Sequence, residues 1–117
     1  MSVSQMIEQI KQSRDAGGIG MILTHVGLVR DFSRDGRAVS GLRVEVDRQE
    51  LARVLSREKK APGIFDIRVE IEQDKALCVG DEIMRLVVAG DIREHVIPAL
   101  ERTLSAIKET VTHKTEY

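Results

Sequence analysis

The order of the periodic segments constrains the fold of this chain more than any single motif does. Strand-like segments occur in two successive pairs, and a helical segment stands before, between and after these pairs. The clearest strand is residues 65–73, where Phe65, Ile67, Val69 and Ile71 alternate with charged side chains. Strand pairs separated by helices predict an α+β fold with a mainly antiparallel sheet and helices packed on it.

The first two helices have recognisable boundaries in the sequence. Ser2 and Gln5 form a capping-box pattern ahead of an apolar stripe, and the glycine pair that follows predicts an end near Asp15. A second helix is expected over residues 47–60, because an aspartate and a glutamate three residues later open it. Pro62 stops it.

The last helical segment, residues 91–111, has an ambiguous start. Asp91 could begin it as a capping residue, but Pro98 would then lie in the helix interior and break a hydrogen bond. A start near Glu94, or a kink, is therefore favoured. The residues after this helix are expected to form a short tail.

The remaining segments predict strands and turns. Residues 19–26 are apolar almost throughout, which predicts a strand buried on both faces. An Asp-Gly hairpin signal within residues 34–37 leads into a returning strand, residues 39–46, with one wet face. Residues 76–90 contain a Gly-Asp turn and a strand that ends at Gly90.

Composition excludes several classes of protein. The 117 residues suit one domain over residues 1–117, and a net charge of -1 offers no overall field for nucleic acid or a membrane surface. Aromatic residues make up 3% and tryptophan is missing, so a stacking platform for single-stranded nucleic acid is not expected. No segment resembles a signal peptide or a membrane span, so we expect a soluble cytoplasmic protein.

Cysteine and histidine positions give no sign of a metal site. Cys78 lies among apolar residues and is expected to be a buried, inert thiol, and a single cysteine favours a reducing compartment. His25 alternates within an apolar strand and suits a hydrogen-bonded core histidine. His95 could act as a base near a helix start, but no nucleophile accompanies it. With His113 also isolated, we expect neither a metal site nor a cofactor.

Four basic residues stand out by position. Arg30 follows a predicted strand and a glycine, and Arg93 lies near a helix N-terminus, where free N–H groups favour an anion. Lys108 lies near the end of the last helix, and Lys114 follows in the tail. Each of them, taken singly, also suits an ordinary solvated charge.

Together these positions form a pattern that resembles a known family. The segments GLVR (residues 27–30) and VGDEI (79–83), with Arg93, Lys108 and Lys114 in this order, resemble the large, catalytic subunit of molybdopterin synthase, or MoaE-like proteins. The similarity extends over nearly the whole chain. It implies an α/β-hammerhead-like version of the α+β fold.

The resemblance also implies an activity in molybdenum cofactor biosynthesis. In that family a small ubiquitin-like sulfur-carrier subunit presents a C-terminal thiocarboxylate, and sulfur passes to cyclic pyranopterin monophosphate to form a dithiolene. Carried over to this sequence, Lys108 is the catalytic lysine and Lys114 supports it. Arg30 and Arg93 bind the substrate, because bidentate arginine suits phosphate. The family is dimeric, with pockets shared between subunits.

Helix geometry supports a shared pocket. Arg93 and Lys108 are fifteen residues apart, so on one helix they are separated by about 22 Å. One small substrate cannot touch both. If both serve one pocket, they are expected to come from different chains of a homodimer.

The sequence also departs from the family pattern. Ile92 stands where the family has a histidine, and Glu72, Gln73 and Lys75 replace a histidine, an arginine and a glycine. Two alternatives therefore stay open. One is a divergent, non-catalytic dimer that acts as a binding or regulatory module, and the other is an enzyme for a different phosphorylated small molecule.

Overall fold

The computed structural model describes all 117 residues of the chain. Its helices and strands are, in chain order, α1 (Val3–Lys11), β1 (Met21–Leu28), β2 (Gly41–Val46), α2 (Arg48–Lys59), β3 (Ile64–Ile71), β4 (Leu77–Cys78), β5 (Glu82–Gly90), α3 (Arg93–Ala106) and β6 (Thr112–Glu116). A 3₁₀ turn (Ala16–Gly18) follows α1, and a π-helical turn (Ile107–Val111) extends α3. The strands form two antiparallel sheets, in the orders β1-β5-β3 and β4-β2-β6. The predicted α+β fold is confirmed.

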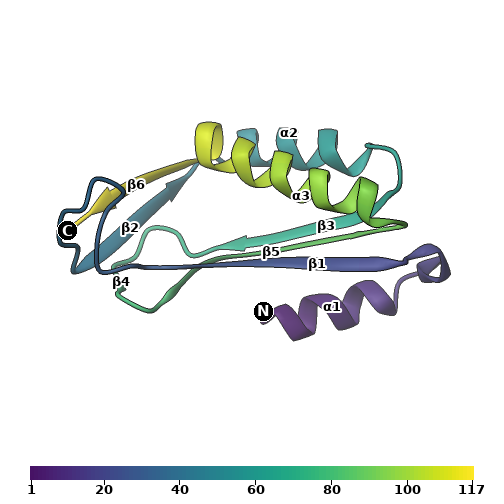
Figure 1. The fold of residues 1–117 in the computed structure, drawn as a ribbon, viewed down its shortest axis with the longest axis horizontal. Helices are drawn as coiled ribbons and strands as arrows, with labels where there is room; N and C mark the ends of the chain where they lie inside the picture. Colours follow the sequence, from purple (N-terminus) through teal and green to yellow (C-terminus); the bar gives the residue numbers. More distant parts are fainter.

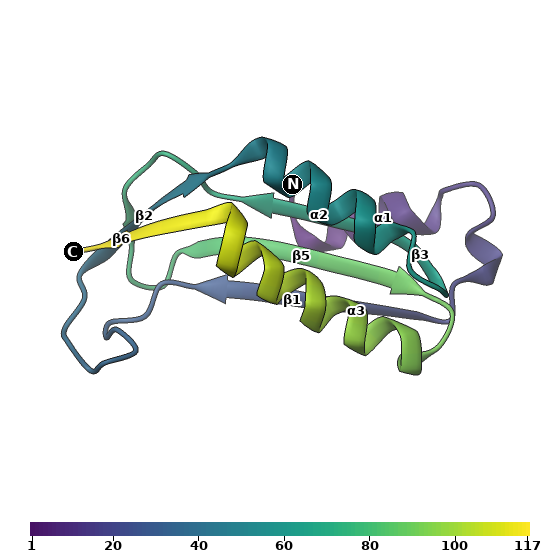
Figure 2. The same cartoon turned by 90° about the horizontal axis from the view of Figure 1, so that it is seen from above.

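The larger sheet is covered on both faces. Helices α2 and α3 lie side by side over one face, and α1 lies against the other (Figure 1 and Figure 2). Strand β5 is central, so its alternate residues serve two cores. Leu86 and Val88 pack towards α2 and α3, whereas Val87 and Ala89 pack against α1. Burial of each large aliphatic side chain contributes about 1.5–3 kcal/mol, which explains why residues 86–89 of this strand are all apolar.

Strand β1 differs from its prediction. It is an edge strand that pairs only with β5, and Val26 and Leu28 remain exposed rather than buried. The Asp-Gly segment does not close a hairpin between β1 and β2 either, although a bridge between Phe32 and Ala38 closes a small loop there. The chain crosses at this point from the larger sheet to the smaller one, so β1 and β2 have different partners.

Helix boundaries follow the caps closely, with one exception. The Ser2–Gln5 capping box is confirmed, and Asp47 accepts a hydrogen bond from the Glu50 N–H at the start of α2. Helix α1, however, ends at Lys11, four residues before the predicted end. No large apolar residue follows Ile10 until the chain has turned towards β1, so further helical turns would have nothing to pack against the sheet.

The C-terminal part of the chain confirms one prediction and differs from another. Helix α3 begins at Arg93, in agreement with the predicted start near Glu94, and contains Pro98 as its sixth residue. The expected tail is strand β6, which pairs along β2 with Lys114 opposite Val44. Its sequence has no apolar alternation, and therefore gives no strand signal by itself.

Two side chains lie on a different side from the one predicted. The register of β3 shifts between Ile64 and Asp66, so Phe65 packs towards α1 while Ile67 faces α2 and α3. Cys78 is exposed rather than buried, because it lies in the two-residue strand β4 at the edge of the smaller sheet.

None of the helices has the length and apolar character needed to cross a membrane.

Candidate functional site

Lys108 lies in the π-helical turn that extends α3. Ile107 and Val111 of this turn are fully buried and fix it to the core. Thr110 donates a hydrogen bond to the Ala106 carbonyl at 2.9 Å, which satisfies a backbone acceptor in the widened turn. Such turns are rare and occur frequently at functional sites.

Lys108 is surrounded by other cations. Although Lys108 is exposed, partial desolvation lowers the pKa of its ammonium group first, and the charges of Lys114, Arg34 and Arg30 lower it further, in that order. These four residues are called the cation cluster below. They come from the loop after β1, from the π-helical turn and from β6, so the fold unites three separate segments at one end of the sheet (Figure 1).

The loop after β1 holds two of the four cations in a defined position. Val29 is buried, and its N–H donates to the Asp81 carbonyl at 3.0 Å, which anchors the neighbouring Arg30. The Arg30 guanidinium lies 4.6 Å from the centre of the Phe32 ring, in a cation–π contact. Ser33, also buried, accepts a hydrogen bond from the Arg37 N–H and closes the turn that carries Arg34.

No carboxylate neutralises the cation cluster. None of its four members forms an ion pair, although most of the other lysines and arginines of the chain do. Arg85, for example, pairs with Glu70, Glu72 and Glu82. Like charges held together raise the free energy of the folded state unless an anion joins them. The cluster is therefore suited to an anionic ligand.

His25 lies beside the cluster and was not singled out as a site residue from the sequence. It is half-buried on the face of β1 that Met21 and Leu23 turn towards α3. Burial lowers the pKa of its imidazole, and the charge of Lys108 lowers it further. The expected hydrogen-bonded core histidine is wrong, because its side chain is only partly buried and has no hydrogen-bond partner in the protein.

The cavity at the cluster is small. It has a volume of about 40 Å³, which is room for roughly one water molecule. Besides Arg30, Lys114 and Glu116 it is lined by apolar residues: Leu28, Val29, Phe32, Val39, Leu42 and Ile83. A heterocyclic substrate does not fit inside this cavity, so such a ligand would have to lie over the cluster.

Arg93 does not join the cluster. It is the first residue of α3, whereas Lys108 lies two residues beyond the last, so about 22 Å of helix separates them. Arg93 is exposed and pairs with Glu94 at 3.0 Å. Close by, the Asp91 carboxylate is 2.8 Å from His95 Nδ1, and this contact lowers the pKa of Asp91.

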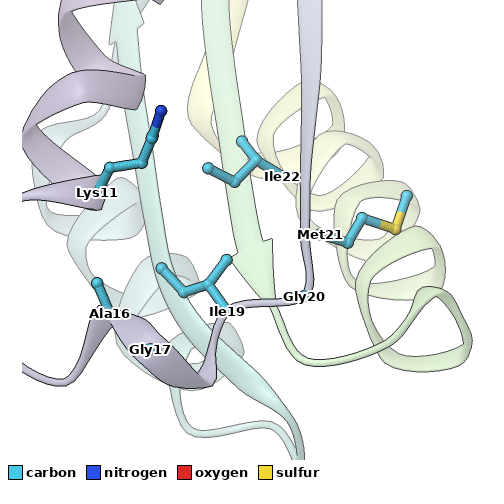
Figure 3. Close-up of a pocket in the computed structure, with 7 residues that line it drawn as sticks. All are labelled: Lys11, Ala16, Gly17, Ile19, Gly20, Met21 and Ile22. Atoms are coloured by element: carbon cyan, nitrogen blue, oxygen red, sulfur yellow. The ribbon is translucent and has the colours of Figure 1, made fainter.

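A larger hollow, of about 470 Å³, lies far from the cation cluster. It is formed by the end of α1, the 3₁₀ turn and the start of β1 (Figure 3). Lys11 is its one charged residue, and the others are small or apolar: Ala16, Gly17, Ile19, Gly20, Met21 and Ile22. It offers neither a nucleophile nor an acid–base pair. No group of three or more potential metal ligands is found anywhere in the chain.

Comparison with known proteins places the chain in a family. The family model described as "MoaE protein" matches residues 1–110. No curated protein sequence matches the chain significantly.

Solved structures of similar fold cover the whole chain. Molybdopterin synthase from Staphylococcus aureus has a TM-score of 0.79 at 21% identity, covering 100% of this chain and 85% of that one. Molybdopterin cofactor biosynthesis protein E from Burkholderia multivorans gives 0.78 at 22% identity, with 99% and 80% covered. A complex of subunits 1 and 2 of molybdopterin-converting factor from Helicobacter pylori gives 0.74 at 15% identity, with 99% and 78% covered. At such identities, the likeness establishes the fold.

Proposed function

The chain belongs to the MoaE protein family, and hence to molybdenum cofactor biosynthesis, and from this premise we propose that it is a sulfurtransferase of the molybdopterin synthase type. It transfers sulfur twice, each time from the C-terminal thiocarboxylate of a small ubiquitin-like subunit, to cyclic pyranopterin monophosphate, which becomes a dithiolene. The observation that carries this proposal is the cation cluster, whose four charges have no carboxylate partner.

The chemistry of the reaction accounts for this concentration of positive charge. The thiocarboxylate is an anion and the substrate carries a phosphate, so both reactants are attracted to the same site. Arg30 binds the phosphate, for which its planar guanidinium is well suited. Lys108 stabilises the negative charge that develops on oxygen during acyl transfer, and Lys114 keeps it in position. Apolar side chains at the rim, Leu28 and Phe32, exclude water.

A homodimer completes the site. The cavity of one chain is too small for the substrate, and Arg93 lies a helix length away from Lys108. A second copy that places its own Arg93 over the cluster supplies both the missing cover and the second substrate arginine. Ile92 and Ile97 are large exposed apolar residues beside Arg93 and suit such a contact. The solved two-subunit complex of similar fold supports a small protein partner.

A dimeric binding module without activity is the second candidate. One observation favours it: Ile92, which precedes Arg93 at the N-cap of α3, has an exposed apolar side chain that can neither donate nor accept a proton. This module would keep the anion site and the partner but make no dithiolene.

The test is reconstitution with defined components. The purified chain, a thiocarboxylated small subunit and cyclic pyranopterin monophosphate are mixed, and dithiolene is measured for wild type, Lys108→Ala and the control Lys60→Ala. Lys60 is an exposed, unpaired lysine at the end of α2. Product from wild type and Lys60→Ala, but none from Lys108→Ala, is expected. If a known synthase makes product and wild type does not, the sulfurtransferase proposal is wrong and the binding module becomes the favoured candidate.

The same assay tests the shared site. Lys108→Ala and Arg93→Ala are each expected to be inactive, because each lacks one component of every site. Mixed dimers of the two variants contain one intact site, so random reassortment restores about a quarter of wild-type activity. No recovery after verified subunit exchange would show that the site does not lie between two copies.

A further inference from the structure

His25 is the titratable side chain on β1 that faces the cation cluster. Strand alternation turns Met21, Leu23 and His25 towards α3, and the first two pack into the core under this helix. His25 is the last of the three and lies nearest to the loop that carries Arg30. Its neighbour across the sheet, on β5, is Leu86, which is fully buried and apolar.

The charged group that acts directly on His25 is Lys108 of the π-helical turn. Lys108 in turn lies near Arg30 and Arg34 of the loop after β1 and near Lys114 of β6, so the charges beyond it are positive as well. The His25 ring extends along β1 towards this loop, since its Nε2 lies 3.5 Å from the position that a Cβ at Gly27 would take. One carboxylate, Glu116, lines the small cavity together with Arg30 and Lys114, and no carboxylate contributes to the shift in the pKa of His25. His25 itself has neither a hydrogen bond nor an ion pair within the protein.

An unpaired imidazole at this place responds to what occupies the cluster. In the empty site, burial and the positive charge of Lys108 both disfavour the imidazolium form and lower the pKa of His25. An anion bound to the cluster reverses the electrostatic part of this effect, because it adds negative charge within reach of the ring. The two events are thermodynamically linked, so each must favour the other.

We propose that His25 is a proton-linked member of the anion site. Its imidazole is neutral while the site is empty, and it takes up one proton from solvent when a dianionic group such as a phosphate binds the cation cluster. The imidazole becomes imidazolium, and a fifth positive charge forms only when the ligand is present. This inference rests on the anion site of the proposed function, and it adds a pH-dependent recognition of dianions to that site.

Sulfate is the appropriate probe, since it remains a dianion across the pH range in which histidine titrates. Two quantities are measured by NMR: the pKa of the His25 imidazole with and without sulfate, and the sulfate affinity at pH 5.5 and 8. Wild type is compared with His25→Gln. The control is His113→Gln. His113 is an exposed histidine on β6, where it pairs with Glu45 of β2, and its side chain points to the opposite face of β6 from Lys114.

Sulfate is expected to raise the pKa of His25 and to bind wild type more tightly at pH 5.5 than at pH 8. The affinity changes by up to about tenfold for each unit by which the pKa moves. His25→Gln should lose this pH dependence and His113→Gln should keep it. If sulfate binds equally at both pH values, or if the dependence survives in His25→Gln, the proton linkage is wrong while the anion site stands. If sulfate does not bind, or binds equally to Lys108→Met, the anion site itself is wrong and the linkage falls with it.

Discussion

Replacement of Lys108 by methionine is expected to stabilise the fold while it abolishes activity. The side chain keeps its length and apolar stem but loses a charge that three neighbouring cations and partial desolvation disfavour, although the residue is exposed. Exposed charge pairs contribute a few tenths of a kcal/mol each because solvent screens them, so three repulsive neighbours amount to about 1 kcal/mol. In a chain of this length, that corresponds to an increase in Tm of about 4 °C.

The assay is urea unfolding of wild type and Lys108→Met at low and high salt, followed by circular dichroism. The free energy of unfolding is expected to rise in the variant at 20 mM NaCl and to rise much less at 1 M NaCl, where the Debye length is about 3 Å. Lys60→Met is the control, because this lysine lies outside the cluster, and a gain is not expected there. A variant that is less stable than wild type, or a gain that is independent of salt, would refute the argument that the cluster is repulsive.

Two further predictions concern other parts of the molecule. Gly63→Ala should lower the free energy of unfolding by about 2–3 kcal/mol, since Gly63 has φ +77° and an added Cβ would collide with the side chains of His95 and Asp91. The control Gly36→Ala should lower it by only about 1 kcal/mol, because Gly36 has φ +87° but open space around it. Equal losses for the two variants in urea unfolding would contradict the collision. His25→Gln should reduce the loss of unfolding free energy that wild type shows as the pH falls. The pKa of His25 is below 6.5 in the folded protein, so the unfolded chain binds the proton first, and wild type loses stability as the pH falls from 6.5 through the folded-state pKa. Parallel curves of unfolding free energy for the two proteins between pH 8 and 5 would contradict this.

Local signals in the sequence predicted most of the elements, with strand β6 missed, but did not predict how the strands pair. The cap at Asp47 and the stop at Pro62 bracket α2 correctly, because caps and prolines act within a few residues. Strand pairing is a long-range choice. β1 pairs with β5, about sixty residues away, rather than with β2, which follows it. Nothing within the apolar stretch of β1 indicates that it lies at an edge.

The candidate site was predictable only in part, because it too depends on contacts between segments that lie far apart in the sequence. Arg30, Lys108 and Lys114 were singled out by their positions and by resemblance, and the fold brings them together. Arg34 was missed because it lies within a turn signal that explains its polarity by itself. His25 was identified as a core residue because β1 appeared buried on both faces. Its nearness to Lys108 depends on the π-helical turn, which has no known sequence signature here.

The way the cations are held supports the proposal that the cluster binds a ligand. Each segment that brings a cation has a buried apolar anchor: Val29 precedes Arg30, Ile107 precedes Lys108, and Val44 lies opposite Lys114. The core therefore fixes positions that repulsion between the side chains would otherwise separate. A site fixed in this way needs little ordering when an anion binds, so more of the interaction energy appears as affinity. Repulsion in the empty site and attraction in the filled one are then two consequences of the same arrangement, which is why the stabilising substitution at Lys108 and the loss of function are expected in a single variant.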